Sequence, residues 1–282
     1  MSNGALIFAQ NNVEIDYVKL AVFSATKIIQ HLDIPVSIVT DGKGWLEEAY
    51  PNHPFDKVIE LTTNDPIQKK KFHDGSITST VLNWKNLSRS QVYNLTPYDK
   101  TLVLDSDYVL NSSILKTAFD NDYDFQIYKR SFDLSPWRPT AEFERINQYS
   151  IPFYWATAFV FQKNTIMQSF FDLVTYIKTN WSYFRILYNI DATNFRNDFA
   201  FSIAIHIMNG KTNGGFAIEL PGVMTYVTDK DILVSADNNK MKFLLERQHH
   251  LGEYMLAKTN NLDVHVMNKA SLSRFIDGGY GV

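Results

Sequence analysis

The stretch from Tyr98 to Tyr108 places the strongest constraint on the fold. Leu102–Leu104 is a short, continuous apolar run, typical of a strand buried on both faces, and it ends directly in Asp105-Ser106-Asp107. Residues i and i+2 of an extended chain point the same way, so Asp105 and Asp107 can reach one point just beyond the carboxyl end of the strand. Open α/β sheets bind their ligands at that end.

Two adjacent carboxylates in a dry cleft repel each other unless a cation lies between them. A hard divalent ion with oxygen ligands, Mn²⁺ or Mg²⁺, is the natural occupant of such a site. We therefore predict that Asp105 and Asp107 are metal ligands. A polar exit from the strand into a loop produces the same triplet, so this prediction depends on the rest of the chain.

The predicted elements alternate between strands and helices. An apolar run at 5–9, a helical stripe at 17–32 and a β-branched run at 34–39 predict a βαβ unit with parallel, neighbouring strands. Residues 131–150 are rich in Pro, aromatic and charged residues and are predicted to form a long loop that covers a site. Further strands are predicted at 57–61, 124–128, 159–162, 218–220 and 224–227, and helices at 84–95, 165–178, 198–208 and 240–256. The predicted fold class is α/β, with a mixed, mainly parallel sheet flanked by helices in a single domain of residues 1–282.

Composition excludes several classes of protein. The chain is 45% hydrophobic and 14% aromatic, which is ample for a core and argues against disorder. No apolar run reaches the length of about 18 residues that a transmembrane helix needs, and no basic leader precedes the first apolar run. The absence of cysteine excludes disulfides, thiolate metal sites and a cysteine nucleophile. We expect a soluble cytoplasmic protein that does not act at a membrane.

Charge is distributed unevenly along the chain. The net charge of −3 does not by itself indicate nucleic-acid binding. Two sets of basic residues stand out, however, and solvated surface charge is the alternative explanation for both. The first set is Lys69, Lys70, Lys71, His73, Lys85 and Arg89, and the second is Lys240, Lys242, Arg247, His249 and His250.

The βαβ start, followed by a mid-chain strand ending in Asp-x-Asp, resembles the GT-A glycosyltransferases. The stretch from Arg89 to Asp107 looks like the same region of the glycogenin-like, family 8-type retaining branch. This resemblance implies a nucleoside diphosphate sugar as donor, with Arg89 reaching the sugar nucleotide. It also implies that Asp105 and Ser106 contact the donor, as do Ala9 and Asn11 at the end of the first strand.

Two later segments extend the resemblance. Asp263-Val264-His265-Val266-Met267-Asn268-Lys269 resembles the late His…Lys element of the family, although the family's usual Gly-x-x-Lys-Pro-Trp is missing. The resemblance implies His265 as the third metal ligand and Lys269 as a diphosphate contact. The segment 196–202 resembles the helix start that carries an acidic residue, here Asp198, beneath the donor sugar. Residues 1–128 would then bind the nucleotide sugar and residues 129–282 would lie on the acceptor side.

The predicted function is metal-dependent transfer of a sugar to an acceptor hydroxyl, and the resemblance implies a UDP-sugar as the donor. Asp198 and Arg89 are the predicted catalytic residues, and we expect Asp107→Ala to abolish transfer while leaving the fold intact. A sugar-1-phosphate nucleotidyltransferase needs a Gly-rich basic loop after the first strand, where this chain reads Gln10-Asn11-Asn12-Val13-Glu14. A non-catalytic nucleotide-sugar-binding module is a further alternative.

The acceptor is predicted from the basic sets and from a second resemblance. Small transferases of this general look occur in large tailed phages, where some modify 5-hydroxymethylcytosine in DNA. The basic sets and the aromatic, arginine-rich segment Arg130–Arg145 would suit a nucleic-acid face. We therefore predict hydroxymethylated DNA as the acceptor, in the host cytoplasm if the source is a phage. A protein or oligosaccharide acceptor is the alternative.

Overall fold

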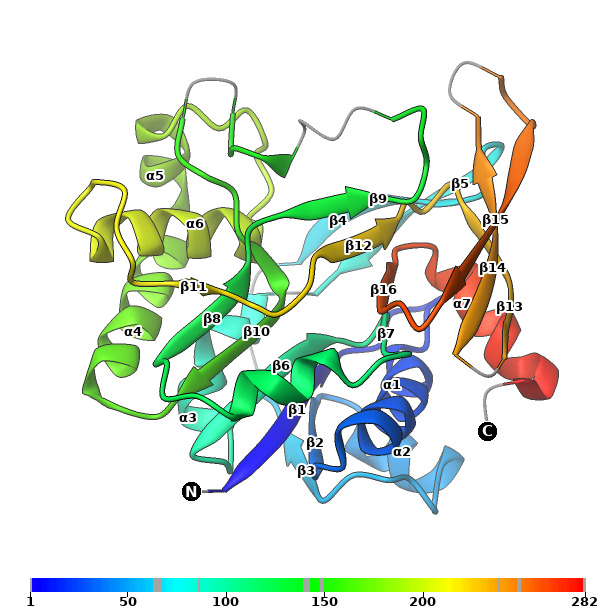
Figure 1. Ribbon diagram of the computed structural model, residues 1–282, viewed down its shortest axis with the longest axis horizontal. Coiled ribbons are helices and arrows are strands. Elements are labelled where there is room, and N and C mark those ends of the chain that lie inside the picture. Colours follow the sequence, from blue (N-terminus) through cyan, green and yellow to red (C-terminus); the bar gives the residue numbers. More distant parts are fainter. Residues whose placement is uncertain are drawn as a thin grey trace.

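The central element is a mixed seven-stranded sheet (Figure 1). The computed structural model describes residues 2–62, 67–85, 87–138, 143–147, 150–237, 239–247 and 250–280. Within the sheet β1 (Asn3–Ala9) is parallel to both β2 (Val36–Thr40) and β6 (Lys100–Asp105), whereas β10 (Trp155–Gln162) is antiparallel to β6 and β8 (Phe125–Tyr128). The order is β11 (Ile218–Glu219), β8 (Phe125–Tyr128), β10 (Trp155–Gln162), β6 (Lys100–Asp105), β1 (Asn3–Ala9), β2 (Val36–Thr40) and β3 (Lys57–Glu60). The predicted α/β class with a mainly parallel sheet is confirmed.

Helices cover the sheet because their apolar stripes pack on its buried strands. The first, α1 (Tyr17–Leu32), begins where the Asp16 carboxylate accepts the Lys19 N–H and ends at Asp33, whose φ of 57° is left-handed. Leu102, Val103 and Leu104 of β6 are fully buried, as predicted for a strand covered on both faces. The other helices are α2 (Lys43–Ala49), α3 (Val92–Leu95), α4 (Thr165–Thr179), α5 (Trp181–Leu187), α6 (Asn197–Met208) and α7 (Lys269–Phe275). Shorter helical segments are η1 (Leu87–Gln91), η2 (Ile114–Phe119) and η4 (Ile276–Tyr280).

Three smaller sheets surround one end of the central sheet (Figure 1). The four-stranded sheet has the order β7 (Tyr108–Val109), β16 (Val264–Val266), β12 (Met224–Val227) and β9 (Ser131–Asp133). The three-stranded sheet contains β13 (Ile232–Asp237), β14 (Lys240–Glu246) and β15 (Tyr254–Asn260), and a separate hairpin joins β4 (Gln68–Asp74) to β5 (Thr78–Trp84). Among the described residues, no helix is long and apolar enough to cross a bilayer.

The helix predicted at 240–256 is wrong. These residues form the antiparallel strands β14 and β15, in which buried Met241, Phe243 and Leu245 alternate with more exposed residues on the other face. This alternation has the period of a strand that is half covered by protein. The stretch spans two strands and their turn. The apolar residues of this hairpin also fit a helical spacing, which is why a single helix was predicted.

Two other predictions also need correction. The helix predicted at 84–95 begins only at Leu87, because Trp84 ends strand β5. The hairpin β4–β5 was not predicted at all, since the run Lys69–Lys71 hid its alternation. In the predicted loop 131–150, the first three residues form β9, while residues 139–142 and 148–149 lie outside the described part of the chain. His249 of the second basic set lies outside it too.

Candidate functional site

A cleft of about 700 Å³ lies at the carboxyl ends of β1 and β6. Its floor is made by Asp105, Ser106 and Asp107, which follow the buried strand β6. Because the parallel strands β1, β2 and β6 all end on this side, the cleft occupies the usual ligand-binding edge of an open α/β sheet. Asp105 and Asp107 lie at this edge, and their role in binding a ligand stays a prediction.

Three potential metal ligands meet on the cleft floor. Asp105, Asp107 and His265 each offer one ligand atom, and these atoms lie within 4.8 Å of one another. Strand pairing brings His265 there, because β16 runs antiparallel to β7 with His265 opposite Tyr108, the residue after Asp107. The Nε2 of His265 lies 3.2 Å from Oδ2 of Asp107. Two carboxylates and an imidazole fit Mn²⁺ or Mg²⁺, so the donor set suits the predicted ion.

Each carboxylate of this cluster also contacts a basic side chain. The Lys269 ammonium lies 2.6 Å from Oδ2 of Asp107, and Arg89 forms an ion pair with Asp105. Burial alone would raise the pKa of the Asp107 carboxyl, but Lys269 and His265 together lower that pKa well below its usual range. Burial would lower the pKa of Lys269, yet Asp107 outweighs it and raises that pKa. Both groups are therefore ionised at neutral pH.

Arg89 and Asp198 are connected through one residue of β10. The Nη1 of Arg89 donates to the Ala156 carbonyl at 2.6 Å, and the Ala156 N–H donates to Oδ1 of Asp198 at 3.0 Å. Asp198 opens α6, as predicted, and its other oxygen accepts from Arg196 at 2.8 Å. Burial lowers the pKa of Arg89 to about 10, although the Asp198 and Asp107 carboxylates oppose that shift. These contacts hold both predicted catalytic residues on the cleft wall.

The remaining predicted donor contacts are placed differently. Ser106 lines the cleft, but Ala9 is fully buried and is not among the lining residues. Asn11 uses its side chain locally, since its Oδ1 accepts from the Val18 N–H and its Nδ2 donates to Asp16. The neighbouring Gln10 lines the cleft instead. The donor contacts of Ala9 and Asn11 stay predictions.

Several cleft residues were not predicted to lie there: Lys70 was assigned from the sequence to the first basic set and its nucleic-acid face, and the others were given no role in a site. Lys70, Phe72 and Trp84 project from the β4–β5 hairpin into the cleft, and Tyr17 reaches it from the start of α1. Alternate residues of a strand share a face, so recognising the hairpin would have placed Lys70 and Phe72 together. Arg196 was named only as part of the segment around Asp198. Its position two residues before that acid was the one sequence signal that it would lie beside Asp198 in the site.

Comparisons with known proteins return remote structural likenesses only. No protein-family model and no curated protein matches the chain. Among solved structures, it is similar to the glycosyltransferase GlyE of Streptococcus pneumoniae TIGR4, at 10% identity and a TM-score of 0.42, covering 78% of this chain and 45% of GlyE. It is also similar to LgtC, a galactosyltransferase solved with donor and acceptor sugar analogues, at 14% identity and a TM-score of 0.45. This match covers 77% of this chain and 72% of LgtC. A third likeness is to the bifunctional IspDF of Campylobacter jejuni, at 12% identity and a TM-score of 0.38. This match covers 79% of this chain and 50% of IspDF.

This chain thus spans less than half the length of GlyE. Identities and TM-scores this low assign neither a family nor an activity, so the function has to be inferred from the residues of the cleft.

Proposed function

We propose that this protein is a metal-dependent glycosyltransferase that moves a sugar from a nucleoside diphosphate donor, expected to be a UDP-sugar, to an acceptor hydroxyl. The observation that carries this proposal is the convergence of Asp105, Asp107 and His265 within 4.8 Å at the carboxyl end of a buried strand. The cleft around them, at about 700 Å³, has the size of a small-molecule site. Its basic side chains suit a diphosphate.

In the proposed reaction the bond between the anomeric carbon and the diphosphate oxygen breaks, and its electron pair leaves with the diphosphate. The acceptor oxygen forms the new bond to that carbon, and its proton passes to an oxygen of the departing diphosphate. Mn²⁺ or Mg²⁺ held by Asp105, Asp107 and His265 would neutralise the charge that builds on the diphosphate. Lys269 supplies a second positive charge, and Asp198 is placed to orient the sugar or to balance positive charge on the anomeric carbon.

The nucleotidyltransferase alternative requires backbone amides that are free to cradle phosphates after the first strand. In this chain the side chains of Asn11, Asn12 and Asp16 accept hydrogen bonds from the backbone amides of this loop and of the first turn of α1. Amides that are already bonded inside the protein are not available to a triphosphate. The observation favours the glycosyltransferase over this alternative.

A donor screen tests the proposal directly. Purified protein with Mn²⁺ is incubated with a panel of nucleoside diphosphate sugars, and release of the nucleoside diphosphate is measured with and without candidate acceptors. We expect slow donor hydrolysis that EDTA and Asp107→Asn abolish. Donor binding without any turnover across the panel would instead identify a non-catalytic binding module.

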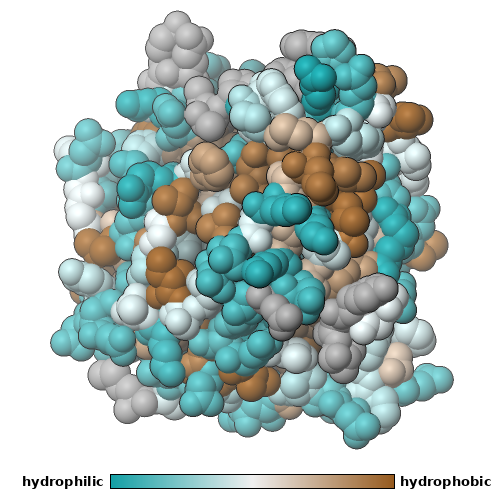
Figure 2. Space-filling model, turned by 45° about the vertical axis from the view of Figure 1, so that its right-hand side comes forward, coloured by the Kyte–Doolittle hydropathy of each residue, from teal (hydrophilic) through white to brown (hydrophobic). Residues whose placement is uncertain are grey.

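We propose hydroxymethylated DNA as the acceptor, on the basis of the first basic set. Lys69 and Lys71 are exposed on the outer face of β4, at the rim of the cleft. Each set also contains cations that are already paired, Lys85 with Asp41 and Arg89 with Asp105 in the first and Arg247 with Glu253 in the second. Figure 2, which brings this side of the molecule forward, shows hydrophobic and hydrophilic residues interleaved rather than one hydrophilic face.

The acceptor is tested by reversing charge on the outer face of β4. The double variant Lys69→Glu/Lys71→Glu should lower transfer to hydroxymethylated DNA and spare slow donor hydrolysis, because these side chains would hold phosphates away from the metal site. Transfer by the unaltered protein should also fall steeply with salt. Failure to modify such DNA at low salt, combined with transfer to a protein or an oligosaccharide, would refute the DNA acceptor and leave the glycosyltransferase proposal standing.

A further inference from the structure

The cleft contains several basic side chains, and nearly all of them are paired inside the protein. Among the lysines and arginines that line it within the described residues, only Lys70 has a side chain that forms no hydrogen bond and no ion pair. The others pair as Lys85 with Asp41, Arg89 with Asp105, Arg138 with Asp133 and Asp231, Arg196 with Asp198, and Lys269 with Asp107. An anion entering the cleft therefore meets one cation whose charge is not already balanced by a carboxylate.

Two aromatic rings fix where that cation lies. The Nζ of Lys70 is 4.9 Å from the centre of the Trp84 ring and 5.4 Å from the centre of the Phe72 ring, within the range of cation–π attraction. The Lys269 ammonium also approaches Phe72, at 6.0 Å from the same ring centre. Lys70 on the hairpin wall and Lys269 on the floor thus converge on one side chain of the cleft.

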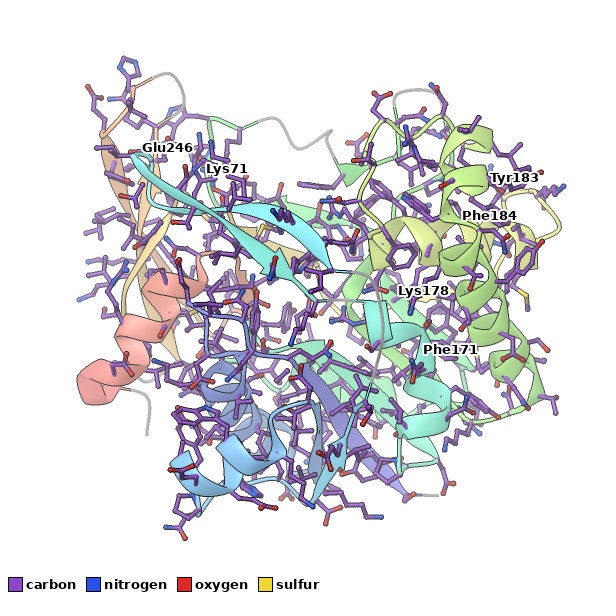
Figure 3. All side chains as sticks on the ribbon, turned by 180° about the vertical axis from the view of Figure 1, so that it is seen from behind. Lys71, Phe171, Lys178, Tyr183, Phe184 and Glu246 are labelled. Carbon is purple, nitrogen blue, oxygen red and sulfur yellow. The ribbon has the colours of Figure 1, made fainter. Side chains whose placement is uncertain are left out.

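The hairpin that carries Lys70 is attached at both ends. At its base, the Phe195 N–H donates to Gln68 at 2.7 Å, and the Asn194 side chain donates to the Lys69 carbonyl at 2.8 Å. Near its tip, Asp74 accepts two hydrogen bonds from Arg274, at 2.6 and 2.8 Å. Figure 3, seen from behind, shows this hairpin crossing the molecule, with Lys71 labelled on it. The attachments hold the wall across the cleft.

Burial and neighbouring cations disfavour the charged form of Lys70. Solvent reaches the side chain because the cleft is open, but protein surrounds the ammonium on most sides, and this partial desolvation lowers the pKa of Lys70 to about 8. The cations Lys269 and Arg196 lower it further, while Asp229 and Asp107 act in the opposite direction. An anion bound among these three cations would relieve their mutual repulsion.

We propose that Lys70 binds an anionic oxygen of the donor's terminal phosphate, opposite the metal cluster, and so forms the hairpin side of the diphosphate site. This inference rests on the proposed function and adds to it a residue from a separate element. A carboxylate on the donor sugar would satisfy the same cation, so the source of the anion has to be separated by experiment. Sugar-free diphosphates bind through phosphate alone and make that distinction.

The test measures binding of UDP and of inorganic pyrophosphate, in the presence of Mn²⁺, by isothermal titration calorimetry. In Lys70→Met the affinity for both should fall about ten- to a hundredfold, the scale of a lost charge-assisted hydrogen bond. Lys70→Arg should retain most of the affinity. UMP has one phosphate fewer and should lose much less in Lys70→Met. Lys258→Met is the matched control, because Lys258 is an exposed lysine on a strand, β15, that does not line the cleft and belongs to neither basic set.

A pH series adds a second readout. UDP affinity of the unaltered protein should decrease between pH 7 and pH 9 as the ammonium loses its proton, and Lys70→Arg should flatten that decrease. Equal UDP affinity in Lys70→Met and the unaltered protein would overturn the inference and spare the proposed function. A loss confined to UDP-glucuronate, with UDP unaffected, would overturn it as well by assigning the cation to a sugar carboxylate. If the unaltered protein binds neither UDP nor pyrophosphate with Mn²⁺, the proposed function fails together with the inference.

Discussion

Replacing Lys269 by methionine should strengthen binding of Mn²⁺ in the absence of nucleotide. In the structure the Lys269 ammonium lies 2.6 Å from Asp107 Oδ2, so a protein cation already contacts a predicted metal ligand. A metal ion that binds Asp107 has to displace this ammonium. Methionine has a similar shape and no charge, so Lys269→Met removes the competitor while keeping most of the packing.

The size of the effect follows from the contact that is lost. A hydrogen bond between charged groups contributes about 1.5–3 kcal/mol; here the Asp107 side chain is buried and the Lys269 side chain is 13% exposed. Metal binding to the variant no longer has to break this contact. Since about 1.4 kcal/mol corresponds to a factor of ten, the affinity for Mn²⁺ should rise roughly 10- to 150-fold.

The assay is titration of the protein with Mn²⁺, following the free ion by electron paramagnetic resonance, first without and then with UDP. With UDP the gain should shrink or reverse, because the displaced Lys269 of the unaltered protein can then contact phosphate. This would be a coupling between metal and diphosphate carried by one side chain.

Lys85→Met is the matched control for this titration. Lys85 is also a cleft lysine with an ion pair of 2.6 Å, but its partner is Asp41, outside the metal cluster. Its replacement should leave Mn²⁺ affinity unchanged. Unchanged or weaker Mn²⁺ binding by Lys269→Met without nucleotide would refute the competition between the two cations.

Three further predictions concern stability. Asp107→Ala should lower the free energy of unfolding by about 3–5 kcal/mol, because it leaves Lys269 buried without its carboxylate; urea unfolding at the stability of the unaltered protein would contradict this. Arg89→Met should cost about 3 kcal/mol in the same assay, since it removes the partner of Asp105, and Arg89→Lys should recover part of that loss. Burial raises the pKa of Asp263 to about 6, so the native state binds a proton more readily than the unfolded chain does. Protonation of Asp263 therefore stabilises the fold fully below about pH 4, and this stabilisation is lost as the pH rises through 6. Asp263→Asn should flatten the pH dependence of the melting temperature over that range, and an unchanged dependence would count against the shifted pKa.

The first of these predictions reverses what the sequence suggested for Asp107. From the sequence, Asp105 and Asp107 were two carboxylates repelling each other, so removing one was expected to leave the fold intact. In the structure both carboxylates are already neutralised, by Arg89 and Lys269. The partners lie 16 and 162 residues away along the chain, and no local pattern announces such a pairing.

Local patterns were sufficient wherever one face of an element is continuously apolar. The strand at 102–104, the helix at 17–32 and the edge where Asp105 and Asp107 emerge follow from side-chain periodicity, which is a property of neighbouring residues. The meeting of His265 with Asp107 was predicted from resemblance alone. Antiparallel pairing of β16 with β7 is its physical cause.

The hairpins show where sequence periodicity fails. Lys69, Lys70 and Lys71 have the same charge, but β4 turns Lys70 into the cleft and its two neighbours outward. Residues 240–256 contain enough apolar positions to fit a helix, and the choice of strand depends on pairing with β13 and β15. The sequence by itself determined the buried strands, the first helix and the side-chain types of the candidate metal site. Only the tertiary structure decided which cations are neutralised and that, in the described part of the chain, the Lys70 side chain faces the cleft without a carboxylate partner, because ion pairing depends on distances between segments remote in the chain.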